Sequence, residues 1–119
     1  MDNYELIPRS ESAAVVILRG RIDAAVATEL KEALRLAVSG RYRYLILDLE
    51  PVTFIDSSGL STLVALLRLV REQQGLLFLA GVKDQVQLVL TQTRLNQLFP
   101  TYPDVDTAFK HLASQANGL

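Results

Sequence analysis

The chain has no cysteine and only one histidine among its 119 residues. The absence of cysteine excludes disulfide bonds, thiolate nucleophiles and zinc–thiolate sites. Charge of one sign is also lacking, because 12 lysines and arginines are interspersed with 13 aspartates and glutamates, for a net charge of −1. A chain this close to neutral has no long-range attraction to nucleic acid or to an anionic membrane, so we expect neither as a partner.

Long apolar runs are missing as well. None approaches the roughly 20 residues that a membrane-spanning helix needs, so we expect no membrane insertion. Residues 1–5 have neither the basic nor the apolar segment of a secretory signal, and we expect a cytoplasmic location. Hydrophobic residues make up 50% of the chain and charged residues 21%, which is typical of a globular protein. The length fits one domain over residues 1–119, with about 1–116 ordered and the end from Asn117 onward frayed.

The spacing of apolar residues predicts alternating strands and helices. Short apolar runs rich in β-branched residues predict strands, and apolar residues at every third or fourth position predict helices. The expected strands are 4–8, 13–19, 43–49, 76–80 and a short one at 98–99. The first expected helix is opened by residues 20–23, the second runs from 57 to about 74, the third follows 81–84, and the last starts at 103–104 with Phe109, Leu112, Ala113 and Ala116 as its apolar stripe.

This order of elements indicates an α/β fold. Strands that alternate with helices form parallel pairs with right-handed crossovers, whereas the opening hairpin must be antiparallel. We therefore expect a single domain with a mixed, mostly parallel sheet of four to five strands and about four helices.

The junction Asp56-Ser57-Ser58-Gly59 stands where a strand pattern gives way to a helix pattern. In its simplest interpretation, Asp56 or Ser57 is the N-cap of the helix. The free N–H groups and the dipole at a helix N-terminus also favour negative charge, so a phosphate would be tolerated there. The cap and the phosphate acceptor are compatible interpretations, and the residues alone leave both open.

A family resemblance bears on this choice. Residues 54–60, preceded by Leu47-Asp48-Leu49, resemble the phosphorylation segment of the anti-sigma factor antagonists, the bacterial branch of the STAS domain family. Residues 20–23 resemble the Gly-x-(Leu/Ile)-Asp segment of that family, and residues 86–99 resemble its region of an amphipathic helix followed by a Leu-Phe pair. The similarity covers nearly the whole chain, and it implies the STAS fold.

The resemblance implies a regulatory protein controlled by phosphorylation. Ser57 corresponds to the serine that accepts phosphate from a partner that is both a kinase of the histidine-kinase-like ATPase type and the anti-sigma factor. A phosphatase would reverse the modification. Asp23 and Asp56 would flank the phosphorylation surface, although Asp23 is equally well interpreted as a second helix cap. The residues expected to meet the partner are Asp23, Asp56, Ser58, Gly59, Thr62, Leu66 and Leu69.

Two details of the second helix qualify this picture. Many antagonists have glycine after the Gly-Leu pair, whereas this chain has Ser61-Thr62, so the surface that faces the partner can differ. On a helical wheel Leu69 lies near the polar arc and Leu66 at its edge. The two leucines are candidate contacts, and the alternative is that they pack under a neighbouring loop.

Functions of other classes fit less well. The Gly-x-Ser-x-Gly pattern of a nucleophilic serine is absent, and His111 lies off the apolar stripe of the last helix, as a surface residue would. The spacing of Asp23, Asp48 and Asp56 matches no metal-ligand pattern. We therefore expect no enzyme activity, metal or cofactor. The main rival is a STAS adaptor that is not phosphorylated, as a subunit of a lipid-transport or signalling complex.

Overall fold

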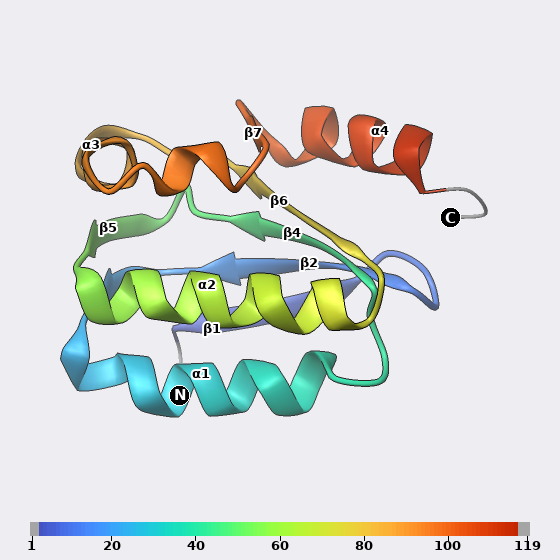
Figure 1. The fold of residues 1–119 in the computed structure, drawn as a ribbon, viewed down its shortest axis with the longest axis horizontal. Coiled ribbons are helices and arrows are strands. Elements are labelled where there is room, and N and C mark those ends of the chain that lie inside the picture. The colour runs from blue at the N-terminus through green and yellow to red at the C-terminus, as the bar shows by residue number, and fades with distance from the viewer. Residues whose placement is uncertain (1–2, 117–119) are drawn as a thin grey trace.

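The computed structural model describes residues 3–116 (Figure 1). The expectations for residues 1–2 and for the end from Asn117 onward lie outside this range. The strands are β1 (Tyr4–Pro8), β2 (Ala13–Leu18), β3 (Gly20–Ile22), β4 (Tyr44–Asp48), β5 (Val52–Ile55), β6 (Leu76–Ala80) and β7 (Thr101–Tyr102). The helices are α1 (Ala24–Val38), α2 (Ser57–Glu72), α3 (Asp84–Gln92), a short 3₁₀ helix (Leu95–Gln97) and α4 (Val105–Gln115).

The main sheet has five strands in the order β1-β2-β4-β6-β7, and β3 and β5 form a separate pair. Within residues 3–116, only the β1–β2 hairpin is antiparallel, and every other strand pair is parallel. The predicted α/β class, the mixed and mostly parallel sheet and the four helices are therefore confirmed.

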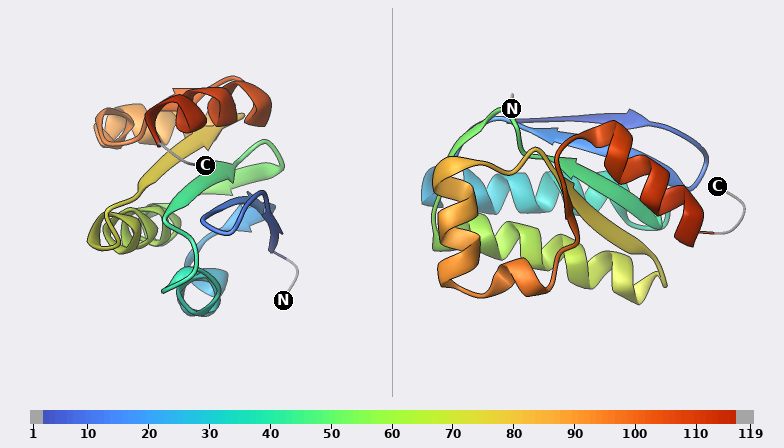
Figure 2. Two further views of the ribbon diagram at one scale, coloured as in Figure 1. Left: turned by 90° about the vertical axis from the view of Figure 1, so that its right-hand side faces the viewer. Right: turned by 90° about the horizontal axis from the view of Figure 1, so that it is seen from above.

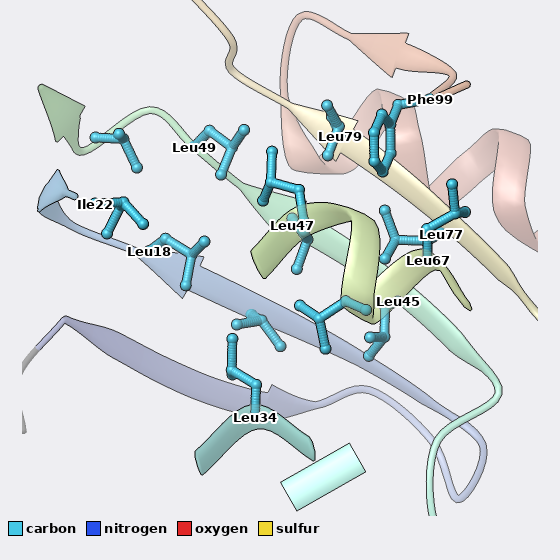
Figure 3. Packing of buried hydrophobic residues seen from close by; sticks show 14 of the residues in the cluster. Leu18, Ile22, Leu34, Leu45, Leu47, Leu49, Leu67, Leu77, Leu79 and Phe99 are labelled. Carbon is cyan, nitrogen blue, oxygen red and sulfur yellow. The ribbon is translucent and has the colours of Figure 1, made fainter. Parts of the chain in front are cut away.

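Strand alternation sends side chains to two different layers. Leu45 and Leu47 of β4 enter a large core beneath α1 and α2, whereas Ile46 between them joins a smaller core beneath α4. Figure 3 shows the larger core, in which Leu34 of α1 and Leu67 of α2 face the leucines of the sheet. The views in Figure 2 confirm that α1 and α2 lie side by side on one face and α4 on the other.

The α4 layer is held by aromatic contacts. The ring of Tyr102 packs against Phe78 at 5.2 Å between centroids and stacks on His111 at 4.6 Å. The guanidinium of Arg9 lies 4.1 Å from the centre of the Phe109 ring. Of the predicted stripe, Leu112 and Ala116 are buried and Phe109 is half-buried, whereas Ala113 is exposed.

Two parts of the predicted order are wrong. Residues 98–99 form no strand: Leu98 ends the 3₁₀ turn and is 41% exposed, and the last strand comes later, at β7. The prediction also missed β3 and β5, which have only three and four residues. Runs this short show no clear alternation, so their pairing depends on the rest of the fold.

The turn after α2 shows why a glycine stands where the sequence predicted the end of this helix. Gln74 takes a left-handed conformation with φ of 61°, and Gly75 follows it into β6. A Cβ atom on Gly75 would lie 1.6 Å from the carbonyl oxygen of Arg43. Gly75 is therefore required because the backbone approaches the start of β4 too closely for any side chain.

Candidate functional site

Two similar strand-to-helix junctions lie side by side in the structure. β3 and β5 are parallel, and Ile22 is paired with Ile55. An aspartate follows each isoleucine, with φ and ψ of −124° and −172° at Asp23 and −121° and −169° at Asp56. Figure 1 shows α1 and α2 starting at the same end of the molecule and running in the same direction.

Asp56 is the N-cap of α2. Its Oδ1 accepts hydrogen bonds from the backbone N–H of Ser58 at 2.9 Å and of Gly59 at 3.1 Å. Ser57 is the first residue of the helix, so Asp56 and not Ser57 makes the cap. The side chain of Ser57 is exposed and that of Ser58 is half-buried, which leaves Ser57 the more accessible of the two hydroxyl groups.

Asp23 caps α1 in the same way, as its alternative interpretation predicts. Its Oδ1 accepts one hydrogen bond, from the N–H of Ala25 at 3.1 Å. Its Oδ2 lies 3.5 Å from Nε of Arg21, and the Arg21 guanidinium lies 4.1 Å from the centre of the Phe54 ring. Asp23 is half-buried, so it remains partly open to a partner.

Gly59 has a structural role in the motif. It is buried, and a Cβ atom added to it would lie 2.1 Å from the carbonyl oxygen of Ile22 and 2.5 Å from Cγ1 of Ile55. The first turn of α2 can rest against the ends of both short strands only because this position has no side chain. The expectation that Gly59 contacts a partner therefore finds no support in this structure.

The expected contacts at Thr62 and Leu66 also need correction. Thr62 is fully buried and Leu66 is 2% exposed, because α1 packs over this side of α2. Leu69 is half-buried and borders a groove of about 490 Å³ between α1 and α2. Leu66 lines the same groove, but Leu69 is the more exposed of the two and so the better candidate for direct contact. The element that covers them is α1 and not a loop.

Ser61 links the two helices near the site. Its hydroxyl donates to the carbonyl oxygen of Ser58 at 3.0 Å and accepts from Nζ of Lys31 in α1 at 2.9 Å. Ser61 lies one turn after Ser57 and on the same side of the helix. The hydroxyl of Ser61 is therefore already hydrogen-bonded to two protein groups.

Sequence reasoning missed Gln85. This residue lies in the first turn of α3, and its side-chain amide forms hydrogen bonds with both backbone groups of Ile55, at 2.9 and 2.8 Å. Ile55 immediately precedes Asp56. No periodic pattern could have shown this contact, because it joins a polar side chain to a strand 30 residues away.

The structure also places the histidine and the acidic side chains of residues 3–116. His111 is stacked on Tyr102 in the α4 layer, on the opposite face of the sheet from α1 and α2. No three histidine, aspartate or glutamate side chains in the described range come together to hold a metal ion. No helix in that range is long and apolar enough to cross a membrane.

Comparisons with known proteins identify the family. The model of the STAS domain matches residues 5–108. The anti-sigma-B factor antagonist of Listeria monocytogenes is 30% identical over 96 residues, which cover 81% of this chain and 84% of the relative.

Solved structures share the fold. SpoIIAA, an anti-sigma factor antagonist of Bacillus, matches in its unphosphorylated form with a TM-score of 0.82, 18% identity and coverage of 96% of this chain and 99% of that one. Its phosphorylated form matches with a TM-score of 0.73, 18% identity and coverage of 91% and 97%. A sulfate transporter family protein from Wolinella succinogenes matches with a TM-score of 0.74, 20% identity and coverage of 94% and 93%. With the match to the family model and to the Listeria protein, the chain belongs to the STAS domain family, in the branch of the anti-sigma factor antagonists.

Proposed function

We propose that this protein is a binding switch controlled by phosphorylation of Ser57. In the unmodified form it binds and sequesters a kinase that is also an anti-sigma factor, and the phosphorylated form releases that partner. The observation that carries this proposal is the placement of Ser57, which is exposed at the first position of α2 and directly follows the cap Asp56.

Electrostatics would favour release at an interface more than damage to the fold. A phosphoserine adds about −1.5 to −2 charges at neutral pH, and the free N–H groups at the start of α2 tolerate negative charge. Asp56 and Asp23 already place two carboxylates at this end of the molecule. A partner bound there would meet added bulk and charge. A coupling of about 1–3 kcal/mol would weaken its binding by roughly 5- to 150-fold.

The proposed contact surface is narrower than the sequence suggested. It contains Asp23, Asp56, Ser58 and Leu69, which are all at least partly accessible. The partner, of the histidine-kinase-like ATPase type, would supply the nucleotide and the chemistry, so we assign no catalytic group to this chain. A phosphatase would restore the binding form. The need for ATP supports a cytoplasmic setting.

The modified residue can be identified directly. Protein taken from its native cells, or incubated with a candidate kinase and ATP, should carry phosphate on Ser57 because this hydroxyl is the most accessible one beside the cap. Tandem mass spectrometry would locate the phosphate. Phosphate found mainly on Ser58 or Ser61, with Ser57 unmodified, would contradict the assignment.

Binding should follow the charge at position 57. Ser57→Ala should bind the kinase like the unmodified protein, and Ser57→Asp should bind several-fold more weakly, although one carboxylate mimics phosphate only in part. The matched control is Ala24→Asp, which adds the same charge at the first position of α1. Calorimetry should show a smaller loss for this control.

A second candidate function is an adaptor that is not phosphorylated. The shared fold with a transporter-family protein favours it. Equal affinity of the partner for the unmodified, phosphorylated and Ser57→Asp forms would remove the switch and support the adaptor. Gene neighbourhood gives an inexpensive check, because a nearby ATPase gene of the kinase type supports the switch and a transporter operon supports the adaptor.

A further inference from the structure

Gln85 forms an unusual contact with the strand that leads into the site. Its Nε2 donates to the carbonyl oxygen of Ile55 at 2.8 Å, and its Oε1 accepts from the N–H of Ile55 at 2.9 Å. A neighbouring strand would satisfy the same two backbone groups in a sheet ladder. β5 has β3 on one side only within its two-stranded sheet, so the amide of Gln85 replaces a missing strand on the other side.

This contact matters because it is made at the residue directly before the cap of α2. Ile55 is followed by Asp56, whose carboxylate holds the N–H groups of Ser58 and Gly59. The side chain of Gln85 thus holds the peptide groups on both sides of Ile55, the residue directly before the cap Asp56. A rotation of these peptide groups would turn the cap and the first turn of α2 with them.

The start of the helix that carries Gln85 has no side-chain cap. α3 begins at Asp84 with φ of 49°, in the left-handed region that residues other than glycine seldom adopt, and Lys83 provides no side-chain cap. Val86 and Leu90 are its only buried residues, and Leu88 is 55% exposed. Val86, Leu90 and the half-buried Val89 attach α3 to the larger core, and the paired hydrogen bonds of Gln85 add a polar link from α3 to β5. Figure 1 shows α3 beside the end of β5.

We propose that Gln85 is a positioning residue, which holds the Ile55–Asp56–Ser57 turn in place and couples α3 to it. Movement of α3 away from β5 breaks both hydrogen bonds and loosens the turn, and by the same linkage a change at the turn alters how firmly α3 is held. The importance of this turn for phosphorylation rests on the proposed function. The coupling itself does not.

Hydrogen exchange followed by NMR tests the coupling on the free protein. In Gln85→Leu, which keeps the size but loses the amide, the N–H of Ile55 should exchange about tenfold faster than in the wild type. The amide signals of Ser58 and Gly59 should shift. The matched control is Gln87→Leu on the same helix, since Gln87 is exposed and its side chain bonds only to Thr91. This control should leave Ile55 and the turn unchanged.

A conservative variant separates positioning from general stability. Gln85→Glu keeps an acceptor for the N–H of Ile55 but cannot donate to its carbonyl oxygen when ionised. The N–H should stay protected while the ¹³C signal of the Ile55 carbonyl moves. This variant also supplies the test if Gln85→Leu does not fold. Unchanged protection of Ile55 in Gln85→Leu, an unmoved carbonyl signal in Gln85→Glu, or an equal acceleration of all amides would overturn the proposal.

Phosphate occupancy at Ser57 separates this proposal from the proposed function. Gln85→Leu should reduce the occupancy measured by mass spectrometry, and Gln87→Leu should not. If wild-type Ser57 accepts no phosphate from any source, the switch fails, yet the exchange measurements still decide whether Gln85 holds the turn.

Discussion

The junctions at the start of α1 and of α2 share a backbone but not a chemistry. In each, an isoleucine ends a short strand and an aspartate caps a helix with nearly the same φ and ψ angles. Ala24 and Ala25 follow the first aspartate, whereas Ser57 and Ser58 follow the second. One junction therefore offers hydroxyl groups beside its cap, and its neighbour offers only methyl groups in the same geometry.

Packing also distinguishes the two junctions. Three residues after the aspartate, α1 has a half-buried Val26, whereas α2 has Gly59, pressed against the backbone of β3. Asp56 accepts two hydrogen bonds from its helix and Asp23 accepts one. Of the two isoleucines that precede these caps, Ile55 is the one whose backbone is hydrogen-bonded to Gln85. The comparison teaches that the junction with the hydroxyl groups is also the one held by more contacts, as the proposed presentation of Ser57 to a kinase would require.

The largest effect is expected at the third position after each cap. Gly59→Ala should lower the free energy of unfolding by about 3 kcal/mol, because the new Cβ would collide with the carbonyl oxygen of Ile22. Val26→Ala, the matched change in α1, should cost about 1 kcal/mol, since Val26 is only half-buried. Urea titrations of the two variants would measure the difference. A loss of less than about 1 kcal/mol for Gly59→Ala would contradict the close approach of α2 to β3.

A smaller effect is expected at the caps themselves. Asp56→Ala should cost about 1.5 kcal/mol and Asp23→Ala about 1 kcal/mol, because the first removes two hydrogen bonds and the second removes one. The exposed contact of Asp23 with Arg21 should add little. Asparagine at either position should recover most of the loss, since it caps as well as aspartate. The ranking is contradicted if Asp23→Ala proves the more damaging variant in thermal unfolding.

The smallest effect on the fold should come from phosphate on Ser57. The N-terminal N–H groups of α2 tolerate the charge, so the melting temperature should change by no more than about 4 °C, which corresponds to roughly 1 kcal/mol or less. Circular dichroism of the two forms should agree. A loss of helix on phosphorylation would mean that the switch works by local unfolding. Ala24→Asp, which adds one negative charge at the first position of α1, gives a reference for the effect of charge at the other junction.

Local patterns were enough to predict most of the fold. The continuous apolar run of β6 and the periodic apolar positions of α2 are enough to predict a strand and a helix, because the burial of each element leaves a regular pattern in the sequence. The strands β3 and β5 escaped prediction since they are too short to show a period. The Leu98-Phe99 pair looks like a strand, but Phe99 is buried from the end of a 3₁₀ turn. An apolar pair in the sequence therefore does not determine whether its backbone forms a strand or a turn.

The site was predictable where it depends on neighbours in the sequence. A cap at this strand-to-helix transition follows from the order Asp56-Ser57, but the sequence left open which of the two residues makes it. The burial of Thr62 and Leu66 depends on α1, which no helical wheel of α2 contains. The contact of Gln85 with Ile55 depends on how α3 packs against β5. Such contacts between distant segments leave no mark in a single sequence.

The stack of Phe78, Tyr102 and His111 offers a spectroscopic readout of the α4 layer. Its three rings connect β6, β7 and α4 at centroid distances of 5.2 and 4.6 Å, so neighbouring protons lie within reach of their ring currents. Phe78 and Tyr102 belong to the smaller core beneath α4, and α4 lies on the face of the sheet opposite α1 and α2. The proton signals of the stack should stay fixed while those around Ser57 move, and they provide an internal reference for how far any change at the junction spreads through the sheet.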